Sequence, residues 1–314
     1  MILCCGEALI DMIPTPTRTV GEGFVPHSGG AIFNTAIALG RLGIDVSFLT
    51  GLSTDLFGQQ LEKDLAASHV DVALAIRSDL PTTLAFVRLL DGHATYTFYD
   101  ENTAGRSLQV IDLPDVPDVV TALYLGGISL ISEPCAEFYA ALAEREAGRR
   151  IVVVDPNIRP GFITDEPRYR ARLKRMISES DILKVSDEDL DWIDASDTSM
   201  DEKALELLAN GPSTVIVTRG SAGATAYTEA LGKVEVTAHR AEVVDTVGAG
   251  DTFNAGVLAH LAKKGLLEKT RIETLSAADL TGALRHGATI AAITVSRAGA
   301  NPPWAHELST NADP

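Results

Sequence analysis

Residues 244–252 read VDTVGAGDT, a stretch that joins the end of a predicted strand at residues 242–245 to the start of a predicted helix. Gly248 and Gly250 permit unusual backbone angles and a close approach of the main chain to a ligand. A helix that begins near Asp251 would leave the backbone N–H groups of residues 249–251 without helical partners, and its dipole favours negative charge there. The stretch therefore predicts an anion site at a helix N-terminus.

Asp251 is the residue of this stretch that we expect to carry chemistry. A carboxylate beside a phosphate site can accept the proton of a hydroxyl that is aligned with that phosphate. We expect the helix N-terminus to keep this carboxylate ionised, as a base requires. The alternative is a glycine-rich turn in which Asp251 only caps the helix, since Asp is common at that position.

Outside this stretch, short apolar runs alternate with longer helical patterns. Strands are predicted at residues 2–10, 45–50, 122–126, 151–155, 181–185 and 214–218, and helices at residues 30–43, 57–68, 133–147, 168–178, 201–209, 251–263 and 280–294. This alternation predicts a mostly parallel sheet with helices on both faces. Residues 223–227 and 234–237 are too close together for a crossover helix, so they predict an antiparallel edge pair.

A hairpin is predicted where Asp91-Gly92 separates the alternating runs 83–90 and 93–99, because both residues tolerate the positive φ of a tight turn. Within an α/β pattern it indicates an added flap. We therefore expect one domain over residues 1–314, with segments 12–28 and 83–101 forming a small β lid. Exposed strand edges are usually covered, so the lid is also a candidate surface for a homodimer.

Composition narrows the class of protein. The 314 residues are 46% hydrophobic and carry a formal net charge of −17, which disfavours nucleic acid and anionic membranes as partners. Three cysteines do not make a disulfide framework. The N-terminus lacks the pattern of a signal peptide, and no apolar run reaches the roughly 18 residues of a membrane span, so we expect a cytoplasmic protein.

The carboxyl ends of the predicted strands are followed by polar residues, among them Asp11, Arg159, Lys184 and Thr218. Ligands of open α/β sheets bind at this edge. A dinucleotide-binding oxidoreductase is one class that this arrangement allows. However, residues 6–11 read GEALID after the first strand, where that class requires Gly-x-Gly-x-x-Gly.

The segment DTVGAGD resembles the C-terminal signature of the ribokinase-type carbohydrate kinases, the PfkB family. Gly29-Gly30-Ala31 with Asn34, continuing into LGRLG at residues 39–43, resembles the N-terminal signature of the family, and the resemblance spans nearly the whole chain. It implies an α/β fold of the ribokinase-like type, a three-layer αβα sandwich with a β lid. It also implies an ATP-dependent sugar kinase that uses Mg²⁺ and, beside the anion site, K⁺.

The resemblance assigns roles to individual residues. Its catalytic set comprises Asp251 as the base, Gly248, Ala249 and Gly250 as the anion hole, and Arg159 near the phosphates. Its substrate-binding set comprises Asp11, Gly29, Gly30, Asn34, Phe98 and Arg106. The local sequence leaves other interpretations open: a simple turn at Gly29-Gly30, a surface salt bridge for Arg159, and packing within the hairpin for Phe98.

The resemblance also implies a nucleotide site and two metal sites. The nucleotide set comprises Lys184, Thr218, Gly220, Gly223, Gly248 and Gly250, although residues 218–223 also suit a tight turn between strands. Many family members carry Asn-x-x-Glu where this chain has Ser186-Asp187-Glu188-Asp189, so Asp189 is the candidate for water-mediated Mg²⁺. Asp245, with backbone near residues 247 and 299, is the candidate for a monovalent cation.

Residues 6–14 and 48–58 resemble the bacterial fructokinases of this family. We therefore predict phosphoryl transfer from ATP to the C6 hydroxyl of fructose. A 2-keto-3-deoxygluconate kinase is the alternative, because Arg106 and Arg159 could hold a sugar acid, and another sugar or nucleoside kinase of the family is also compatible. A sugar-binding regulator without activity is disfavoured by the presence of Asp251.

Overall fold

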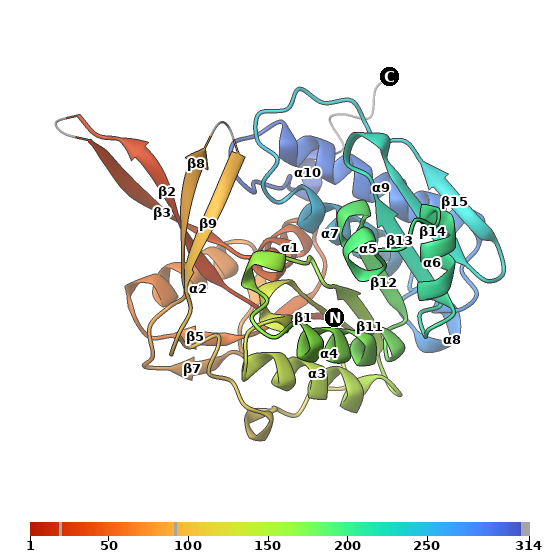
Figure 1. Ribbon diagram of the computed structural model, residues 1–314, viewed down its shortest axis with the longest axis horizontal. Coiled ribbons are helices and arrows are strands. Elements are labelled where there is room, and N and C mark those ends of the chain that lie inside the picture. The colour runs from red at the N-terminus through yellow and green to blue at the C-terminus, as the bar shows by residue number, and fades with distance from the viewer. Residues whose placement is uncertain (19–20, 91–92, 309–314) are drawn as a thin grey trace.

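The computed structural model describes residues 1–18, 21–90 and 93–308. Figure 1 shows a central sheet between two layers of helices, with a second, smaller sheet that extends away from this body. The predicted three-layer α/β arrangement with a β lid is confirmed. No helix within the described residues is long and apolar enough to cross a membrane.

The central sheet has nine strands in the order β15-β14-β13-β12-β11-β10-β1-β4-β6. Their bounds are β1 Ile2–Cys5, β4 Val46–Leu49, β6 Val70–Asp71, β10 Ala122–Gly126, β11 Ile151–Asp155, β12 Ile182–Ser186, β13 Thr214–Thr218, β14 Ala224–Thr228 and β15 Gly232–Val236. All pairs are parallel except those that β14 makes with β13 and β15. The predicted antiparallel edge pair is therefore confirmed.

Side chains of the central strands alternate between two cores. Ile2 and Cys4 of β1 belong to one core, and Leu3 and Cys5 belong to the other, as the two-residue period of a strand requires. The first core is shared with α1 Ala31–Arg41, α2 Leu56–Ala67, α7 Ala249–Lys263, α8 Lys269–Ile272 and α9 Ala277–Val295. The second core is shared with α3 Cys135–Glu146, α4 Glu166–Ser178, α5 Asp187–Ile193 and α6 Met200–Leu208. A last short helix, α10, spans Ala305–Leu308.

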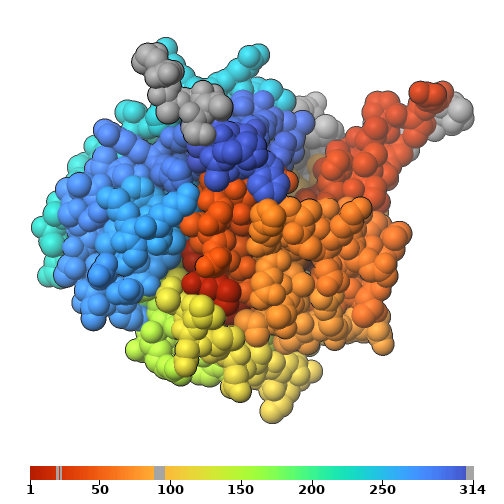
Figure 2. Space-filling model, turned by 180° about the vertical axis from the view of Figure 1, so that it is seen from behind, coloured from red at the N-terminus to blue at the C-terminus, as the bar shows by residue number. Residues whose placement is uncertain are grey.

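The lid is a four-stranded sheet in the order β3-β2-β8-β9. Its strands are β2 Leu9–Pro16, β3 Glu22–Gly29, β8 Leu84–Leu90 and β9 His93–Tyr99. The predicted antiparallel pairing of residues 83–90 with 93–99 is confirmed, and the Asp91-Gly92 turn lies outside the described residues. Figure 2 shows the arm of β2 and β3, in red, standing clear of the body of the molecule.

Two predicted strands were wrong. The single strand at residues 2–10 is two strands, because the chain leaves the central sheet at Gly6 and enters the lid at Leu9. Asp11 therefore lies within a lid strand and does not follow the first central strand. Residues 242–245 form no strand; the N–H groups of Val244 and Asp245 both bond the carbonyl of Val295 at the end of α9.

Several small elements were not predicted. Among them are helix α5 and a pair of parallel strands, β5 Gly51–Ser53 and β7 Ile76–Ser78. These two strands are only three residues long, too short for a period to show in the sequence. The single-domain boundaries stay a prediction.

Candidate active site

The segment that was predicted to bind an anion forms the start of α7. Gly248 is the N-cap residue with φ +77, and a Cβ there would lie 2.6 Å from the Cβ of Ala300, so both conformation and space require glycine. The N–H of Ala249, predicted to be free, donates to the carbonyl of Thr246 at 3.3 Å. Within the described part of the chain, the N–H groups of Gly250 and Asp251 make no hydrogen bond. Two amides of the first turn therefore stay available for an anion.

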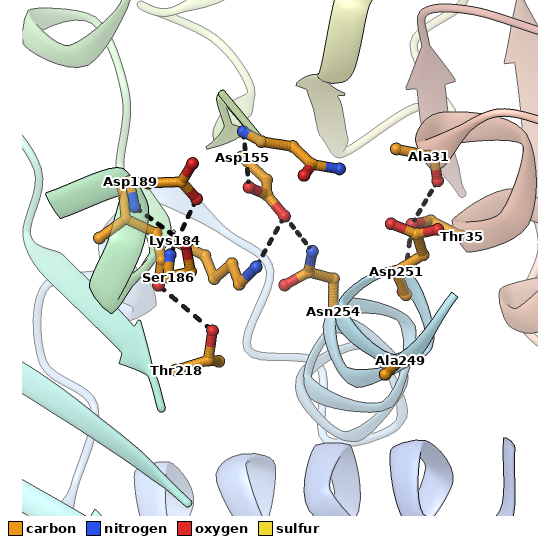
Figure 3. A network of polar contacts seen from close by, with 12 residues as sticks. Ala31, Thr35, Asp155, Lys184, Ser186, Asp189, Thr218, Ala249, Asp251 and Asn254 are labelled. Carbon is orange, nitrogen blue, oxygen red and sulfur yellow. Dashed lines mark hydrogen bonds and ion pairs between the residues drawn. The ribbon is translucent and has the colours of Figure 1, made fainter. Parts of the chain in front are cut away.

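Asp251 lies in this first turn with only 8% of its surface exposed, facing α1. Its Oδ2 accepts a hydrogen bond of 2.9 Å from Nδ2 of Asn34, and its backbone carbonyl accepts one of 3.1 Å from Oγ1 of Thr35. Asn34 was predicted to bind sugar; the structure places its amide on the candidate base. Figure 3 shows Asp251 projecting from α7 toward Ala31 and Thr35 of α1.

The ionisation of Asp251 differs from the sequence-based expectation. Burial raises the pKa of Asp251 from 3.8 to about 7, while the hydrogen bond from Asn34 lowers it, Asp155 raises it and Lys184 lowers it. Desolvation is the largest of these effects, so the expectation that the group stays ionised well below neutral pH is not met. A carboxyl with a pKa near 7 is well matched to general base catalysis at neutral pH.

A second set of buried polar contacts lies beside Asp251 and reaches the central sheet (Figure 3). Nζ of Lys184 lies 3.0 Å from Oδ2 of Asp155, and that same oxygen accepts a 2.6 Å hydrogen bond from Asn254. Asn254 also donates to the hydroxyl of Tyr124 at 2.8 Å. A Cβ at Gly250 would lie 3.5 Å from Nζ of Lys184, so this cation lies beside the anion hole.

Lys184 keeps its charge in this buried position. Desolvation lowers its pKa, but the carboxylates of Asp155, Asp189 and Asp251 outweigh that effect, and the pKa is raised above 10.5. A buried cation beside two free amides is the arrangement that phosphate oxygens need. This supports the prediction that Lys184 contacts the nucleotide.

The predicted sugar residues of the N-terminal half meet at the base of the lid. A Cβ at Gly29 would collide with Oδ2 of Asp11, so only glycine lets the carboxylate occupy that position. Gly30, with φ +110, connects β3 to α1. Burial raises the pKa of Asp11 to about 6. Asp11, Gly29 and Gly30 are therefore brought together, as predicted.

Tyr96 of β9 lies near both this group and Asp251, and it was not in the predicted substrate-binding set. Desolvation raises the pKa of Tyr96, and the charges of Asp11, Asp245 and Asp251 raise it further, whereas Arg159 lowers it. All four charged groups are thus close enough to act on one phenol. Lid strand β9 therefore passes near both Asp11 and the first turn of α7. The hairpin carried the signal, because Tyr96 precedes Phe98 by two residues and shares its face.

Phe98 contacts the segment that follows Arg159 through the aromatic ring of Phe162. The ring of Phe98 contacts that of Phe162 edge to face, with centroids 4.3 Å apart. Phe162 ends a short 3₁₀ helix, Pro160–Phe162, which directly follows Arg159. Arg159 itself is exposed, and its guanidinium donates to the carbonyls of Asn157 and Ile158. The lid thus contacts the segment that carries this arginine.

Arg106 belongs to a different cluster. Its guanidinium donates to Oδ1 of Asp100 at 2.9 Å and to the carbonyl of Glu133 at 2.9 Å. The other oxygen of Asp100 accepts the hydroxyl of Ser132 at 2.8 Å. These contacts join the end of the lid to the segment before α3. Within the described residues Arg106 has no hydrogen bond or ion pair with Asp251, and its role in sugar binding stays a prediction.

Asp189 is occupied by the backbone. Its Oδ1 accepts the N–H of Ile158 at 2.8 Å, and its Oδ2 accepts that of Ser186 at 3.0 Å in a capping box at the start of α5. Residues 1–18, 21–90 and 93–308 contain no group of three His, Cys, Asp or Glu that could hold a metal ion. Side chains in these ranges thus do not form a magnesium site built from protein ligands alone. The role of Asp189 as a water-mediated ligand stays a prediction.

Asp245 has the neighbours that were predicted. Its carboxylate accepts the N–H of Val247 at 3.0 Å and that of Gly299 at 2.9 Å, so it joins the loop before α7 to the loop after α9. This loop pair lies next to the anion hole. The proximity is consistent with the predicted cation loop, and K⁺ itself stays a prediction.

The remaining nucleotide candidates lie at the end of β13. Oγ1 of Thr218 is 3.4 Å from the carbonyl of Val185 on the neighbouring strand. Gly220 and Gly223 have φ +49 and +100, and a Cβ at Gly223 would collide with the carbonyl of Val236. Gly223 is therefore required by strand packing. A nucleotide role for this loop stays a prediction.

Comparison with known proteins gives a consistent assignment. The sequence pattern described as pfkB family carbohydrate kinase matches residues 1–307. A fructokinase of Rhizobium leguminosarum bv. trifolii is 52% identical over 287 residues, which cover 91% of this chain and 86% of the relative. A crystal structure of fructokinase with bound ATP from Xylella fastidiosa matches with a TM-score of 0.88 and 29% identity, over 98% of this chain and 97% of that chain.

A further solved structure broadens the comparison. Aminoimidazole riboside kinase from Salmonella enterica, complexed with aminoimidazole riboside and an ATP analogue, matches with a TM-score of 0.83 and 25% identity over 98% of both chains. The dinucleotide-binding oxidoreductase that the α/β pattern left open is therefore wrong. By its sequence pattern and its fold, this chain belongs to the pfkB family of carbohydrate kinases.

Proposed function

We propose that the chain is an ATP-dependent fructokinase that forms fructose 6-phosphate and ADP. The observation that carries this proposal is the buried carboxyl of Asp251 in the first turn of α7, where Lys184 lies beside Gly250 and where Asp11 and Asp251 both act on Tyr96. The choice of fructose rests on the 52% identical relative, which is named a fructokinase, and the choice of ATP rests on the similar fructokinase structure with bound ATP.

In the proposed reaction, Asp251 accepts the proton of the sugar C6 hydroxyl while the oxygen of that hydroxyl attacks the γ-phosphorus of ATP. One P–O bond forms to the sugar, and the bond between the γ-phosphorus and the bridging oxygen breaks, so its electron pair leaves with ADP. The N–H groups of Gly250 and Asp251 and the ammonium of Lys184 stabilise the charge of the transferred phosphoryl group. Because only ionised Asp251 accepts a proton, kcat/KM should fall about tenfold per pH unit below about pH 7.

The metal requirement is a separate part of the proposal. We expect Mg²⁺ to accompany ATP and K⁺ to bind beside Asp245. The Asp189 carboxylate oxygens each accept a backbone amide already, so we assign no catalytic step to a metal held there.

The proposal is tested by coupled ADP release with a panel of sugars and sugar acids, using the full chain and its Asp251→Asn variant. Turnover should be highest with fructose and should fall at least about hundredfold in the variant. Turnover of 2-keto-3-deoxygluconate without turnover of fructose would overturn the sugar assignment. Full turnover in the variant would overturn the role of Asp251.

The lid offers a surface for the proposed homodimer. Tyr96 and Phe98 of β9 face the site, so the alternation of a strand directs Tyr99 to the other face. There Phe24, Phe86 and Tyr99 form a row of edge-to-face contacts with centroids 5.0 and 5.5 Å apart, and Tyr99 is 61% exposed. An exposed aromatic row on an open sheet favours association. Light scattering that shows only monomer at micromolar concentration would exclude this dimer.

A further inference from the structure

Glu7 is a buried carboxyl for which the proposed reaction has no use. It lies between β1 and β2 with 9% of its surface exposed. Its Oε1 accepts the N–H of Ala31, the first residue of α1, at 3.0 Å. Its Oε2 accepts the N–H of Ser129, in the 3₁₀ helix after β10, at 3.3 Å. One carboxylate thus joins the start of α1 to the end of a central strand that lies far later in the chain.

The backbone around Glu7 leaves room for this carboxylate and for little else. Gly127 has φ +69, and a Cβ there would collide with Oε1 of Glu7. Gly30 has φ +110, and a Cβ there would lie 2.9 Å from the carbonyl oxygen of Glu7 and 3.1 Å from its Cγ. Two glycines from separate segments are therefore packed against one side chain, which fixes the position of Ala31.

Helix α1 carries this fixed position to the candidate base. The hydroxyl of Thr35 lies 3.1 Å from the carbonyl of Ala31 and 3.1 Å from that of Asp251, so the two carbonyls share its single proton. One residue earlier, Asn34 donates 2.9 Å to the Asp251 carboxylate. We propose that Glu7 is a positioning residue for Asp251, because its carboxylate holds the first turn of α1 at the place where Asn34 and Thr35 contact Asp251.

The charge of Glu7 and the position that Glu7 gives to Asn34 change the pKa of Asp251 in opposite directions. The charge of Glu7 raises the pKa of Asp251, and the hydrogen bond from Asn34 lowers it by more. The other charged groups that act on Asp251 are Asp155 and Lys184. Displacement of Asn34 should therefore raise the pKa of Asp251, whereas loss of the Glu7 charge alone should lower it.

Other titratable groups surround Glu7 itself. Cys135 and Tyr139 of α3 feel its charge, and Asp100 and Arg106 line the same small cavity. Burial raises the pKa of Glu7, and the hydrogen bonds from Ser129 and Ala31 lower it. Within the described residues, none of these neighbours forms a hydrogen bond or an ion pair with Asp251.

The test is the titration of the Asp251 carboxyl by ¹³C NMR in Glu7→Gln, with the resonance assigned by its loss in Asp251→Asn. Glutamine keeps the length of the side chain but has only one acceptor oxygen, so one of the two amides loses its partner. We expect the pKa of Asp251 to rise by up to about 1. We also expect kcat to fall about tenfold or more, with the KM for ATP unchanged within about twofold. An unchanged or lowered pKa of Asp251 would overturn the proposal.

A double-mutant cycle makes the test specific to the path through α1. Asn34→Ala alone should raise the pKa of Asp251, and Glu7→Gln added to it should produce no further rise. A further rise of equal size would show that Glu7 does not act through Asn34 and would overturn the proposal. Glu7→Asp keeps the charge, but its side chain is one methylene shorter, so it should also raise the pKa of Asp251. This variant replaces Glu7→Gln in the test if Glu7→Gln fails to fold.

A matched control is Glu146→Gln, which alters another buried, hydrogen-bonded carboxylate, at the end of α3. It should lower thermal stability without changing the titration of Asp251. The inference rests on the proposed role of Asp251 only for its kinetic part. If Asp251→Asn kept its turnover, the proposed base would be wrong, yet the NMR titration would still decide whether Glu7 positions this side chain.

Discussion

Replacing Asp251 with asparagine should make the protein more stable at pH 8 while it removes turnover. A carboxyl whose pKa is higher in the folded state than in the unfolded state binds more protons when folded. Its folded form is therefore progressively destabilised as the pH rises from the unfolded pKa to the folded pKa. For Asp251 this interval runs from 3.8 to about 7. Asparagine has no such penalty and can still accept the hydrogen bond from Asn34.

The size of the effect follows from the difference between the folded and the unfolded pKa of Asp251. A tenfold change in proton affinity corresponds to about 1.4 kcal/mol, so the rise from 3.8 to about 7 corresponds to about 4 kcal/mol as an upper limit. The gain in the free energy of unfolding should be absent below about pH 4, grow between pH 4 and pH 7, and stay constant above. At pH 8, where wild-type Asp251 is ionised, the variant should lose at least about a hundredfold in kcat.

The assay is urea denaturation of the ligand-free protein and its variants at pH 5 and at pH 8. The control is Asp118→Asn, which removes one negative charge from a side chain that is 93% exposed and whose surface ion pair with Arg149 contributes at most about 1 kcal/mol. It corrects for the repulsion within a chain of net charge −17, which any neutralised acid relieves. If Asp251→Asn gained no more than Asp118→Asn at pH 8, the burial of an ionised carboxylate at the anion hole would be refuted.

Three further outcomes are expected. Lys184→Met should lower the free energy of unfolding by about 3–5 kcal/mol in urea denaturation, because it leaves the buried carboxylate of Asp155 unpaired, and Asp155→Asn added to it should restore part of the loss. Turnover should rise when K⁺ replaces Na⁺ at constant ionic strength, and Asp245→Asn should abolish that rise; equal rates with both cations would exclude the cation loop. Phe98→Ala removes the contact with Phe162, so it should raise the KM for the sugar about two- to tenfold and leave the KM for ATP unchanged. An unaltered KM for the sugar in initial-rate measurements would contradict this.

Much of the architecture could be predicted because it depends on local pattern. The parallel sheet, the antiparallel edge pair and the lid hairpin each follow from the spacing of apolar residues and of Gly or Asp in turns. The error at residues 2–10 has a local cause as well. An apolar run shows that a segment is buried, but it does not show that the chain changes sheets at Gly6.

The role of Asp189 had a signal in the sequence. Ser186-Asp187-Glu188-Asp189 has the form of a capping box, with Ser at the N-cap and an acid three residues later. The resemblance of this stretch to a family motif predicts instead that Asp189 binds a metal. The box itself predicts helix α5, the element that was missed, and it predicts that one Asp189 oxygen accepts a backbone amide.

Contacts between distant segments could not be predicted in this way. Asn34 and Asp251 are separated by 217 positions, and only the packing of α1 on α7 shows that the amide binds the carboxylate. Glu7 and Ser129 are likewise joined only in the folded chain. Local sequence does not show how much water a side chain loses on folding, so it could indicate a carboxylate at a helix N-terminus but not the pKa of that carboxylate.

The pKa of Asp251 therefore depends on the whole fold. The local sequence places the group where a helix N-terminus favours its ionised form. Burial between α1 and α7 favours the neutral form and is the largest effect on this pKa, and Asn34 and Lys184 lower the pKa again by part of that amount. A base with a pKa near the working pH requires these opposing effects to be nearly balanced. The same desolvation that brings Asp251 into this range destabilises the folded protein at neutral pH, so in this site stability and activity oppose each other through a single carboxyl.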